Sequence, residues 1–309
     1  MQIHYDLTQL PLFTNAVITI GTFDGIHHGH RRVLTRLVDS AREVNGESIL
    51  ITFHPHPRKV ISSAILGIRL INSLEERLQL LEPMGIDHVV VVPFTEAFAN
   101  QTAEEYIQNF LVSKFHPHTI IIGYDHQFGR DRKGNFSLLQ EKSSHYGYQL
   151  SEISKHELEN ISISSTQIRE AILHSEIEKA NRLLGYDFFF TGRVVHGNKI
   201  GRTIGFPTAN LKVEDPEKIT PGNGIYAVYA LPEGEEKPLK GMMSIGFRPT
   251  VDGKTRVIEV NIFNFNREIY EETLQVFVHK YLREEKKYES LEALVTQIKL
   301  DKENSLAAL

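Results

Sequence analysis

Short, almost continuously apolar runs, each followed by a stretch with helical patterning, dominate the first half of the chain. These runs span 17–21, 47–53, 87–94 and 118–125. Strands that are apolar on both faces are typical of a parallel sheet covered by helices. Helix start signals lie between the runs, including capping-box patterns at 73–76 and 102–105. The alternation predicts a Rossmann-like, doubly wound α/β domain.

The pattern changes after Gly185. From there the chain reads as strands joined by turns rich in Gly, Pro and Asn, followed by one helical pattern. The predicted strands span 188–196, 224–231, 239–246, 256–265 and 274–282, and the helix spans 290–300. A small closed or Greek-key β-barrel with a C-terminal helix explains this order, because closure removes exposed strand edges. The 309 residues therefore divide into two predicted domains, 1–184 and 185–309.

Composition excludes several classes of function. The chain contains no cysteine, which rules out disulfides, thiol catalysis and cysteine-bound zinc. Its net charge of -5 is spread over both halves, so neither half is a basic nucleic-acid arm. No apolar run approaches the roughly 18 residues that span a bilayer, and the first residues do not read as a signal peptide. We expect a cytoplasmic protein, monomeric or weakly homo-oligomeric, without nucleic-acid or membrane partners.

The segment 21–30, GTFDGIHHGH, follows the first predicted strand and opens the first predicted helix. Gly21 and Gly25 permit a tight turn, while the free amides and the dipole of a helix N-terminus favour an anion. His27 and His30 are three residues apart, so on a helix both rings project from the same side and can bond phosphate oxygens. The segment is neither a P-loop nor a G-x-G-x-x-G fingerprint. It resembles the H-x-G-H element of nucleotidyltransferases; a glycine-containing turn with surface histidines is the alternative.

A second polar element lies at 161–169, where Ser164, Ser165, Thr166 and Arg169 open a predicted helix. Hydroxyls with an arginine fork suit the β- and γ-phosphates of a triphosphate, although serine and threonine at a helix start are also ordinary N-caps. Asp125 follows a buried strand and is placed for a substrate or Mg²⁺ contact. The pair in H54-P-H56-P lacks a third ligand for a metal.

In the second half, the segment 192–210 combines glycines with a run of polar side chains. Its glycines allow backbone to approach an anion closely, and Arg202 can offset phosphate charge. Thr208 and Asn210 are two apart on an extended chain, so both oxygens can bind one hard cation such as Mg²⁺.

Glu259 lies in the predicted strand 256–265 and shares a face with Val257, Phe263 and Phe265. A carboxylate among apolar neighbours is either a misassigned surface residue or an acid/base group in a pocket. A base that accepts the proton of a primary hydroxyl attacking a γ-phosphate is what a kinase requires.

Together these motifs resemble the bifunctional riboflavin kinase/FAD synthetase family of prokaryotes, and they occur in the family order over nearly the whole chain. The matching segments are GTFDGIHHGH (21–30), FHPHP (53–57), GYDHQFG (123–129), ISSTQIR (163–169), GRVVHGNKIGRTIGFPTAN (192–210), PGNGIYA (221–227), SIGFRPT (244–250) and IEVNIFNF (258–265). The resemblance implies an N-terminal FMN adenylyltransferase and a C-terminal riboflavin kinase. ATP would be the co-substrate, Mg²⁺ the metal, and riboflavin, FMN and FAD the flavin ligands.

The resemblance also implies roles for residues at matching positions. His27, His30 and Arg169 would act on the triphosphate during adenylyl transfer, and Glu259 would be the general base of the kinase. Flavin contacts would come from His126, Glu259 and Arg283, and Mg²⁺ ligands from Thr208 and Asn210. ATP contacts would come from Gly21, Phe23, Asp24, Gly25, His27, His30, Asp125, Ser165, Thr166, Arg169, Gly197, Arg202, Thr208 and Asn210.

Two departures from the family pattern stand out. His126 occupies a position where the family has Phe, and 264–271 loses an Asp and a Gly after the strand of Glu259. Two other readings stay open. One is a lone nucleotidyltransferase acting on a pantetheine or nicotinate mononucleotide acceptor, with the barrel as a binding module. The other is a flavin-sensing regulator on a retired enzyme fold.

Overall fold

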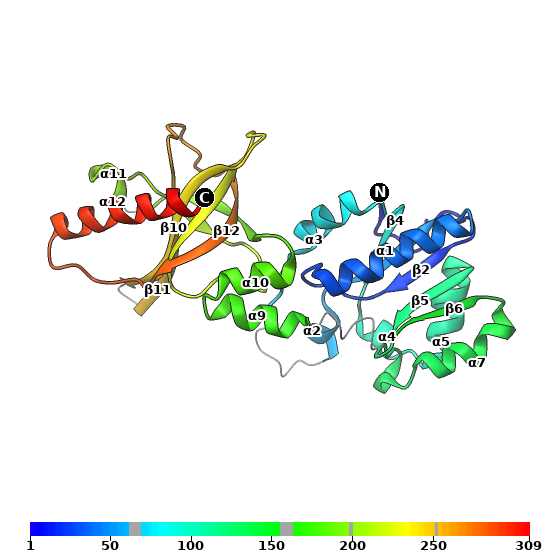
Figure 1. Cartoon of the computed structure of the whole chain (residues 1–309). Coiled ribbons are helices and arrows are strands. Elements are labelled where there is room, and N and C mark those ends of the chain that lie inside the picture. Colours follow the sequence, from blue (N-terminus) through cyan, green and yellow to red (C-terminus); the bar gives the residue numbers. More distant parts are fainter. Residues whose placement is uncertain (62–68, 155–162, 198–199, 251–252) are drawn as a thin grey trace. The chain divides into compact units, whose positions relative to one another are not determined.

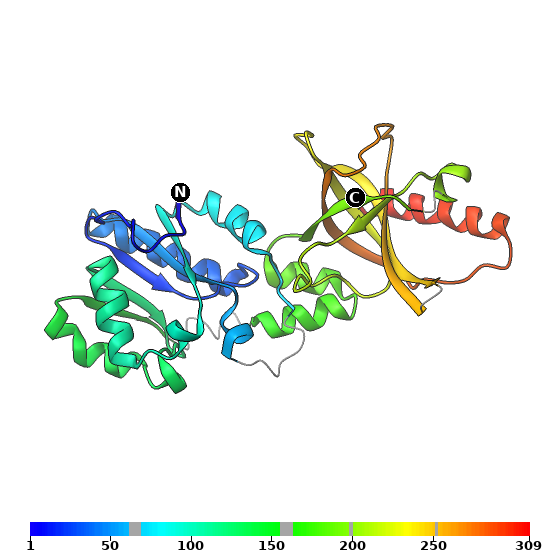
Figure 2. The same ribbon diagram turned by 180° about the vertical axis from the view of Figure 1, so that it is seen from behind.

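The computed structural model describes residues 1–61, 69–154, 163–197, 200–250 and 253–309. Contacts divide the chain into two compact units, which we call the N-terminal unit and the barrel unit (Figures 1 and 2). The N-terminal unit contains Met1–Ile68 and Leu74–Ser164. The barrel unit contains Ser165–Leu309 together with the short segment Arg69–Ser73.

The N-terminal unit is built on a six-stranded sheet in which every neighbouring pair is parallel. The strand order is β1-β4-β3-β2-β5-β6. The strands are β1 (Gln2–His4), β2 (Val17–Ile20), β3 (Ser48–His54), β4 (His88–Pro93), β5 (Thr119–Gly123) and β6 (Gln149–Ile153). The four apolar runs of the sequence are β2 to β5, so the predicted doubly wound α/β domain is confirmed.

Helices cover both faces of this sheet and create two cores (Figure 1). On one face, α1 and α3 bury residues such as Leu34 and Leu81. On the other, the segment around Tyr106 and Phe110 packs with Leu139 of α7. The helices are α1 (His28–Glu43), α2 (Pro57–Ile61), α3 (Leu74–Leu81), α4 (Glu96–Ala99), α5 (Ala103–Glu105), α6 (Ser113–Phe115), α7 (Phe136–Tyr146), two 3₁₀ turns (Glu82–Met84 and Arg130–Arg132) and a π-helix (Tyr106–Val112).

The strand order changes direction next to β2. The chain runs from β2 to β3 and β4 on one side, then returns to place β5 against the other side of β2. Ligands of open α/β sheets bind beyond the carboxyl ends of the strands at such a switch point. The segments 21–30 and 123–129, singled out by sequence, follow β2 and β5 and therefore begin at this edge.

The barrel unit contains a closed antiparallel barrel in the order β10-β11-β8-β7-β12-β9. Its strands are β7 (Phe188–Val195), β8 (Ala209–Lys212), β9 (Gly224–Pro232), β10 (Leu239–Thr250), β11 (Gly253–Ile262) and β12 (Thr273–Arg283). The predicted closed barrel is confirmed, although β8 was not predicted as a strand. The remaining helices are α9 (Ser165–Leu173), α10 (Ile177–Leu184), α11 (Ile200–Thr203) and α12 (Leu291–Ala308). The last of these continues well beyond the predicted end at residue 300.

The helices α9 and α10 group with the barrel. Ile177, Ala180 and Leu184 of α10 are fully buried, and this helix contacts β7 and β12. Asn181 fixes the arrangement, since its side chain accepts from the Phe188 amide at 2.8 Å and donates to the Val278 carbonyl at 3.0 Å. The compact barrel unit therefore begins at Ser165, earlier than the boundary drawn at 184/185 from the change in sequence pattern.

Candidate functional site

The turn after β2 is tightly constrained. Gly25 has φ +96°, a conformation that favours glycine, and Phe23 also lies in the left-handed region at φ +48°. Phe23 and Asp24 are buried, the latter with 2% of its surface exposed. A non-glycine residue held at positive φ is frequent at functional sites. The turn therefore matches the tight turn predicted before the first helix.

His27 is the N-cap of α1 and not a residue of the helix itself. Its Nδ1 accepts a hydrogen bond from the His30 amide at 3.3 Å, and the two rings stack with centroids 3.7 Å apart. Phe23 contacts the His30 ring edge-on, with centroids 5.1 Å apart. Because Nδ1 of His27 is an acceptor, the proton of the neutral ring is on Nε2, where it can be donated to an anion. The structure thus brings the two predicted histidines together at a helix N-terminus.

Arg77 of α3 contacts the turn that follows β2. It is buried and donates a hydrogen bond to the Thr22 carbonyl. Burial lowers the pKa of Arg77, while the negative charges of Asp24 and Glu75 act in the opposite direction. Sequence reasoning missed Arg77, since nothing in the spacing of 22 and 77 indicates a contact.

The turn after β5 carries Asp125 and His126. Asp125 is exposed, whereas His126 is half-buried, and none of the described residues supplies a partner for its Nε2. Burial lowers the pKa of His126 to about 4, against the opposing charge of Asp125. The imidazole at this position is therefore neutral at pH 7, and it retains a polar nitrogen that the Phe of the family pattern would not provide.

Ser165, Thr166 and Arg169 lie in α9, which belongs to the barrel unit. Arg169 donates from Nε to the carbonyl of Arg69 at 2.6 Å, within the same unit. These predicted ATP contacts and the two stacked histidines consequently belong to different compact units. The predicted pairing of the two motifs around one triphosphate stays a prediction.

In the barrel, Glu259 of β11 lies opposite Asn210 of β8 in the strand register. Its Oε1 accepts from the Thr208 hydroxyl at 3.3 Å, and its Oε2 accepts from Arg248 at 2.5 Å. The carboxylate is thus held at both oxygens by polar partners. Three residues assigned from sequence, Thr208, Asn210 and Glu259, come together; Arg248 was missed as a site residue.

Glycines bring the preceding loop against these side chains. A Cβ at Gly197 would overlap the Asn210 amide, and one at Gly201 would overlap the Phe206 carbonyl and lie 3.3 Å from the Thr208 hydroxyl. Only glycine fits either position without displacement of the neighbour. Asn198 and Lys199 of the predicted glycine-rich loop lie outside the described residues.

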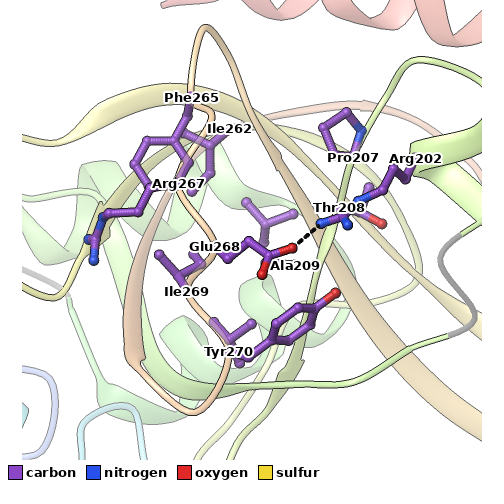
Figure 3. Close-up of a pocket in the computed structure, with 12 residues that line it drawn as sticks. Arg202, Pro207, Thr208, Ala209, Ile262, Phe265, Arg267, Glu268, Ile269 and Tyr270 are labelled. Atoms are coloured by element: carbon purple, nitrogen blue, oxygen red, sulfur yellow. Dashed lines mark hydrogen bonds and ion pairs between the residues drawn. The ribbon is translucent and has the colours of Figure 1, made fainter.

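Arg202 donates to Glu268 at 3.0 Å beside a small cavity of about 70 Å³, which Thr208 and Tyr270 also line (Figure 3). Small-molecule sites usually have volumes of roughly 300 Å³ or more. This cavity is therefore smaller than a typical nucleotide site.

Arg283 is engaged with the C-terminal helix. Its Nε and Nη2 donate to the two oxygens of Asp301 at 2.8 and 2.5 Å, and these bonds raise its pKa. Asp301 is 3% exposed, whereas Leu291 at the start of this helix is 59% exposed. The bidentate pair fastens this part of α12 to the end of β12.

The oxygen donors of the barrel site fit the expected metal. The Thr208 hydroxyl, the Asn210 amide and the Glu259 carboxylate are hard oxygen ligands of the kind that Mg²⁺ takes. Within the described ranges, no group of three His, Cys, Asp or Glu side chains is arranged to hold a metal ion. In the described part of the chain, no helix has the length and apolar character needed to cross a membrane.

Comparisons with known proteins agree with both halves of the structure. The family described as FAD synthetase matches residues 11–167, and the family described as riboflavin kinase matches residues 184–309. A crystal structure named as a macrolide-efflux protein from Streptococcus pneumoniae superimposes with a TM-score of 0.86 at 31% identity, covering 98% of this chain and 97% of that chain.

Two curated relatives carry the same name as each other, bifunctional riboflavin kinase/FMN adenylyltransferase. The protein from Buchnera aphidicola is 38% identical over 93% of this chain and 92% of its own length. The protein from Escherichia coli is 37% identical over 96% of this chain and 93% of its own length. Identity at this level over nearly the full length of both chains confirms the predicted pair of activities. The chain belongs to the bifunctional riboflavin kinase/FMN adenylyltransferase family.

Proposed function

We propose that the residues described above form two sets, one for each reaction. The observation that supports the kinase assignment most directly is the cluster of Thr208, Arg248 and Glu259, with Asn210 opposite the carboxylate. It combines a proton acceptor, a fixed counter-charge and oxygen ligands for a cation in one place.

In the kinase reaction, Glu259 accepts the proton of the ribityl 5'-hydroxyl of riboflavin as that oxygen attacks the γ-phosphorus of ATP. The bond from the γ-phosphorus to the β-phosphate oxygen breaks, which gives FMN and ADP. Arg248 fixes one carboxylate oxygen, so the other, now bonded to Thr208, is the one that meets the substrate. Thr208 and Asn210 would hold Mg²⁺, which when bound neutralises phosphate charge. Gly197 and Arg202 belong to the phosphate-facing loop.

In the adenylyltransferase reaction, a phosphate oxygen of FMN attacks the α-phosphorus of ATP, and pyrophosphate leaves as FAD forms. The nucleophile is already anionic at neutral pH, so this step needs charge stabilisation more than a base. His27 and His30 supply donors at the positive end of α1. The turn of Gly21, Phe23, Asp24 and Gly25 shapes the site, and Asp125, Ser165, Thr166 and Arg169 complete the ATP contacts.

For the flavin, we assign His126 in the N-terminal unit and Glu259 in the barrel as contacts. Arg283 would act indirectly, since its guanidinium is already bonded to Asp301. It would keep α12 in place beside the flavin. We propose the functional boundary at 184/185, with the adenylyltransferase domain before it and the riboflavin kinase domain after it; the two matched families, 11–167 and 184–309, support this order.

A time course with purified protein, riboflavin and MgATP, followed by chromatography of the flavins, tests the proposal. FMN should appear before FAD, and a second run started from FMN should yield FAD directly. FMN that never proceeds to FAD would contradict the adenylyltransferase assignment. Tight flavin binding without turnover would favour the regulator reading.

Three further properties belong to the same proposal. The reactions require Mg²⁺, the protein acts in the cytoplasm without nucleic-acid or membrane partners, and it is a monomer or weak homo-oligomer. Chelation with EDTA should stop both reactions, and excess Mg²⁺ should restore them. Size-exclusion chromatography at several protein concentrations tests the oligomeric state.

A further inference from the structure

A second pocket of the barrel unit is lined by two neighbours of Glu259, Asn210 and Arg248. Asp215 and Lys218 line it as well. Its volume of about 600 Å³ lies within the range of small-molecule sites. A space large enough for a nucleotide therefore lies next to the residues that hold the proposed base.

The lining of this pocket, which we call the cationic pocket, is strongly positive. Its charged lining consists of one carboxylate, Asp215, and five lysines and arginines: Arg69, Lys212, Lys218, Arg248 and Arg256. Like charges gathered in one pocket repel unless an anion lies among them. The composition predicts an anionic ligand.

Three of the five cations are already engaged. Arg248 pairs with Glu259, and Arg256 donates to Thr220 at 2.5 Å and to the Pro221 carbonyl. Lys218 is 3% exposed and donates to the carbonyls of Phe189 at 2.7 Å and Ile71 at 2.5 Å.

The remaining two, Arg69 and Lys212, are exposed, and neither side chain has an ion-pair partner among the residues that the structure describes. The positive charge of Arg69 even acts on Arg256, lowering its pKa in addition to the larger effect of burial. These two side chains are the ones available to a ligand.

The position of Arg69 does not depend on its own side chain. The Leu70 amide donates to the Glu217 carbonyl at 2.7 Å, and the Ile219 amide donates to the Leu70 carbonyl at 2.9 Å. Arg169 holds the Arg69 carbonyl. These hydrogen bonds hold the backbone of residues 69–73 against the barrel unit. The guanidinium of Arg69 is not used in them, so it can bind a ligand.

We propose that Arg69 and Lys212 bind the phosphate groups of a kinase ligand in the cationic pocket. This inference rests on the proposed role of Glu259, which fixes where phosphoryl transfer occurs. A guanidinium and an ammonium are the usual partners of phosphate, the first as a two-pronged donor and the second as a compact charge. Residue 69 lies within the range matched by the FAD synthetase family, yet it serves the kinase. The phosphate comes either from ATP and ADP or from the product FMN.

The test uses the full chain with Arg69→Gln and Lys212→Gln, and Lys237→Gln as the control that removes an exposed charge elsewhere on the barrel unit. Kinase activity is measured as the sum of FMN and FAD formed from riboflavin, with ADP and FMN as product inhibitors. Losing one charged contact to phosphate should weaken binding about tenfold. Arg69→Lys, which keeps the charge but not the fork, should recover part of the loss.

The arms of the test separate the two sources of phosphate. A rise in the KM for ATP with a matching rise in the inhibition constant of ADP identifies the nucleotide, whereas a rise confined to the inhibition constant of FMN identifies the flavin phosphate. Values within twofold of Lys237→Gln for both variants, or an equal loss of FAD synthesis from supplied FMN, would overturn the inference. Wild-type protein that forms no FMN would instead contradict the proposed function.

Discussion

The sites that we propose in the two units would handle phosphate by different means. In the N-terminal unit, the proposed site is a helix start with a strained turn, backbone amides and a pair of stacked imidazoles, and the turn includes the buried Asp24. In the barrel, the site lies across antiparallel strands and consists of a carboxylate between a guanidinium and a hydroxyl. The difference follows from the nucleophiles. A hydroxyl must lose a proton as it attacks, whereas a phosphate need not, so only the barrel requires a base.

The largest effect is expected for Glu259→Gln, which keeps the shape of the side chain and removes the proposed base. We expect kinase activity to fall by a factor of about 10²–10⁴, the usual contribution of a general base. FAD synthesis from supplied FMN should be unchanged. The control is Glu303→Gln on the exposed side of α12. Equal loss of both activities would show that the units are not chemically independent.

His27→Asn tests the proposed site of the N-terminal unit. Asparagine is a good N-cap, so the first turn of α1 stays satisfied while the ring and its Nε2 donor are lost. Adenylyl transfer should fall about 100-fold, the typical effect of removing one preorganised donor, with thermal stability retained. His27→Ala should lose activity and also about 1 kcal/mol of stability, because the cap is lost as well. Activity of His27→Asn near that of wild type would mean that the ring acts only as a cap.

Arg77→Met tests how far the turn after β2 depends on the buried guanidinium, which donates to the Thr22 carbonyl. Leaving a buried acceptor without its donor typically costs about 1–3 kcal/mol. Urea unfolding of the variant should show this loss, with adenylyl transfer reduced and the kinase unaffected. Arg36→Met, on the exposed face of α1, is the matched control. Unchanged stability would mean that the Thr22 carbonyl does not depend on Arg77.

The smallest effect concerns pH and His126. Its folded pKa, about 4, is lower than the ordinary value of 6.5, so protonation favours the unfolded chain. The contribution of neutral His126 is fully present above pH 6.5 and is lost as the pH falls towards 4. The melting temperature of the His126→Phe variant should therefore fall less than that of wild type between pH 7 and pH 4.5. Parallel curves for the two proteins would contradict this account.

The sequence predicted the elements better than their contacts. Apolar runs identify β2 to β5 because burial on both faces leaves a local signature. The meeting of Glu259 with Asn210 depends on strand register, and that of Arg77 with Thr22 on packing between distant elements. The number of residues between the partners along the chain gives no sign of either contact. Motif order along the chain also gives no sign that α9 groups with the barrel, since that follows from the burial of neighbouring α10.

The docking of residues 69–73 has a consequence for the synthesis of the protein. Ile71 and its partner Lys218 are 147 residues apart in the chain. At translation rates of about 5–20 residues per second, the segment leaves the ribosome about 7–30 seconds before Lys218 does. During that interval Leu70 and Ile71 have no barrel to cover them, although the strands on either side of them in sequence can already pair. The nascent chain therefore carries two apolar side chains, Leu70 and Ile71, before their partners in the barrel unit have been made. The N-terminal unit can complete its sheet before residues 69–73 dock onto the barrel unit.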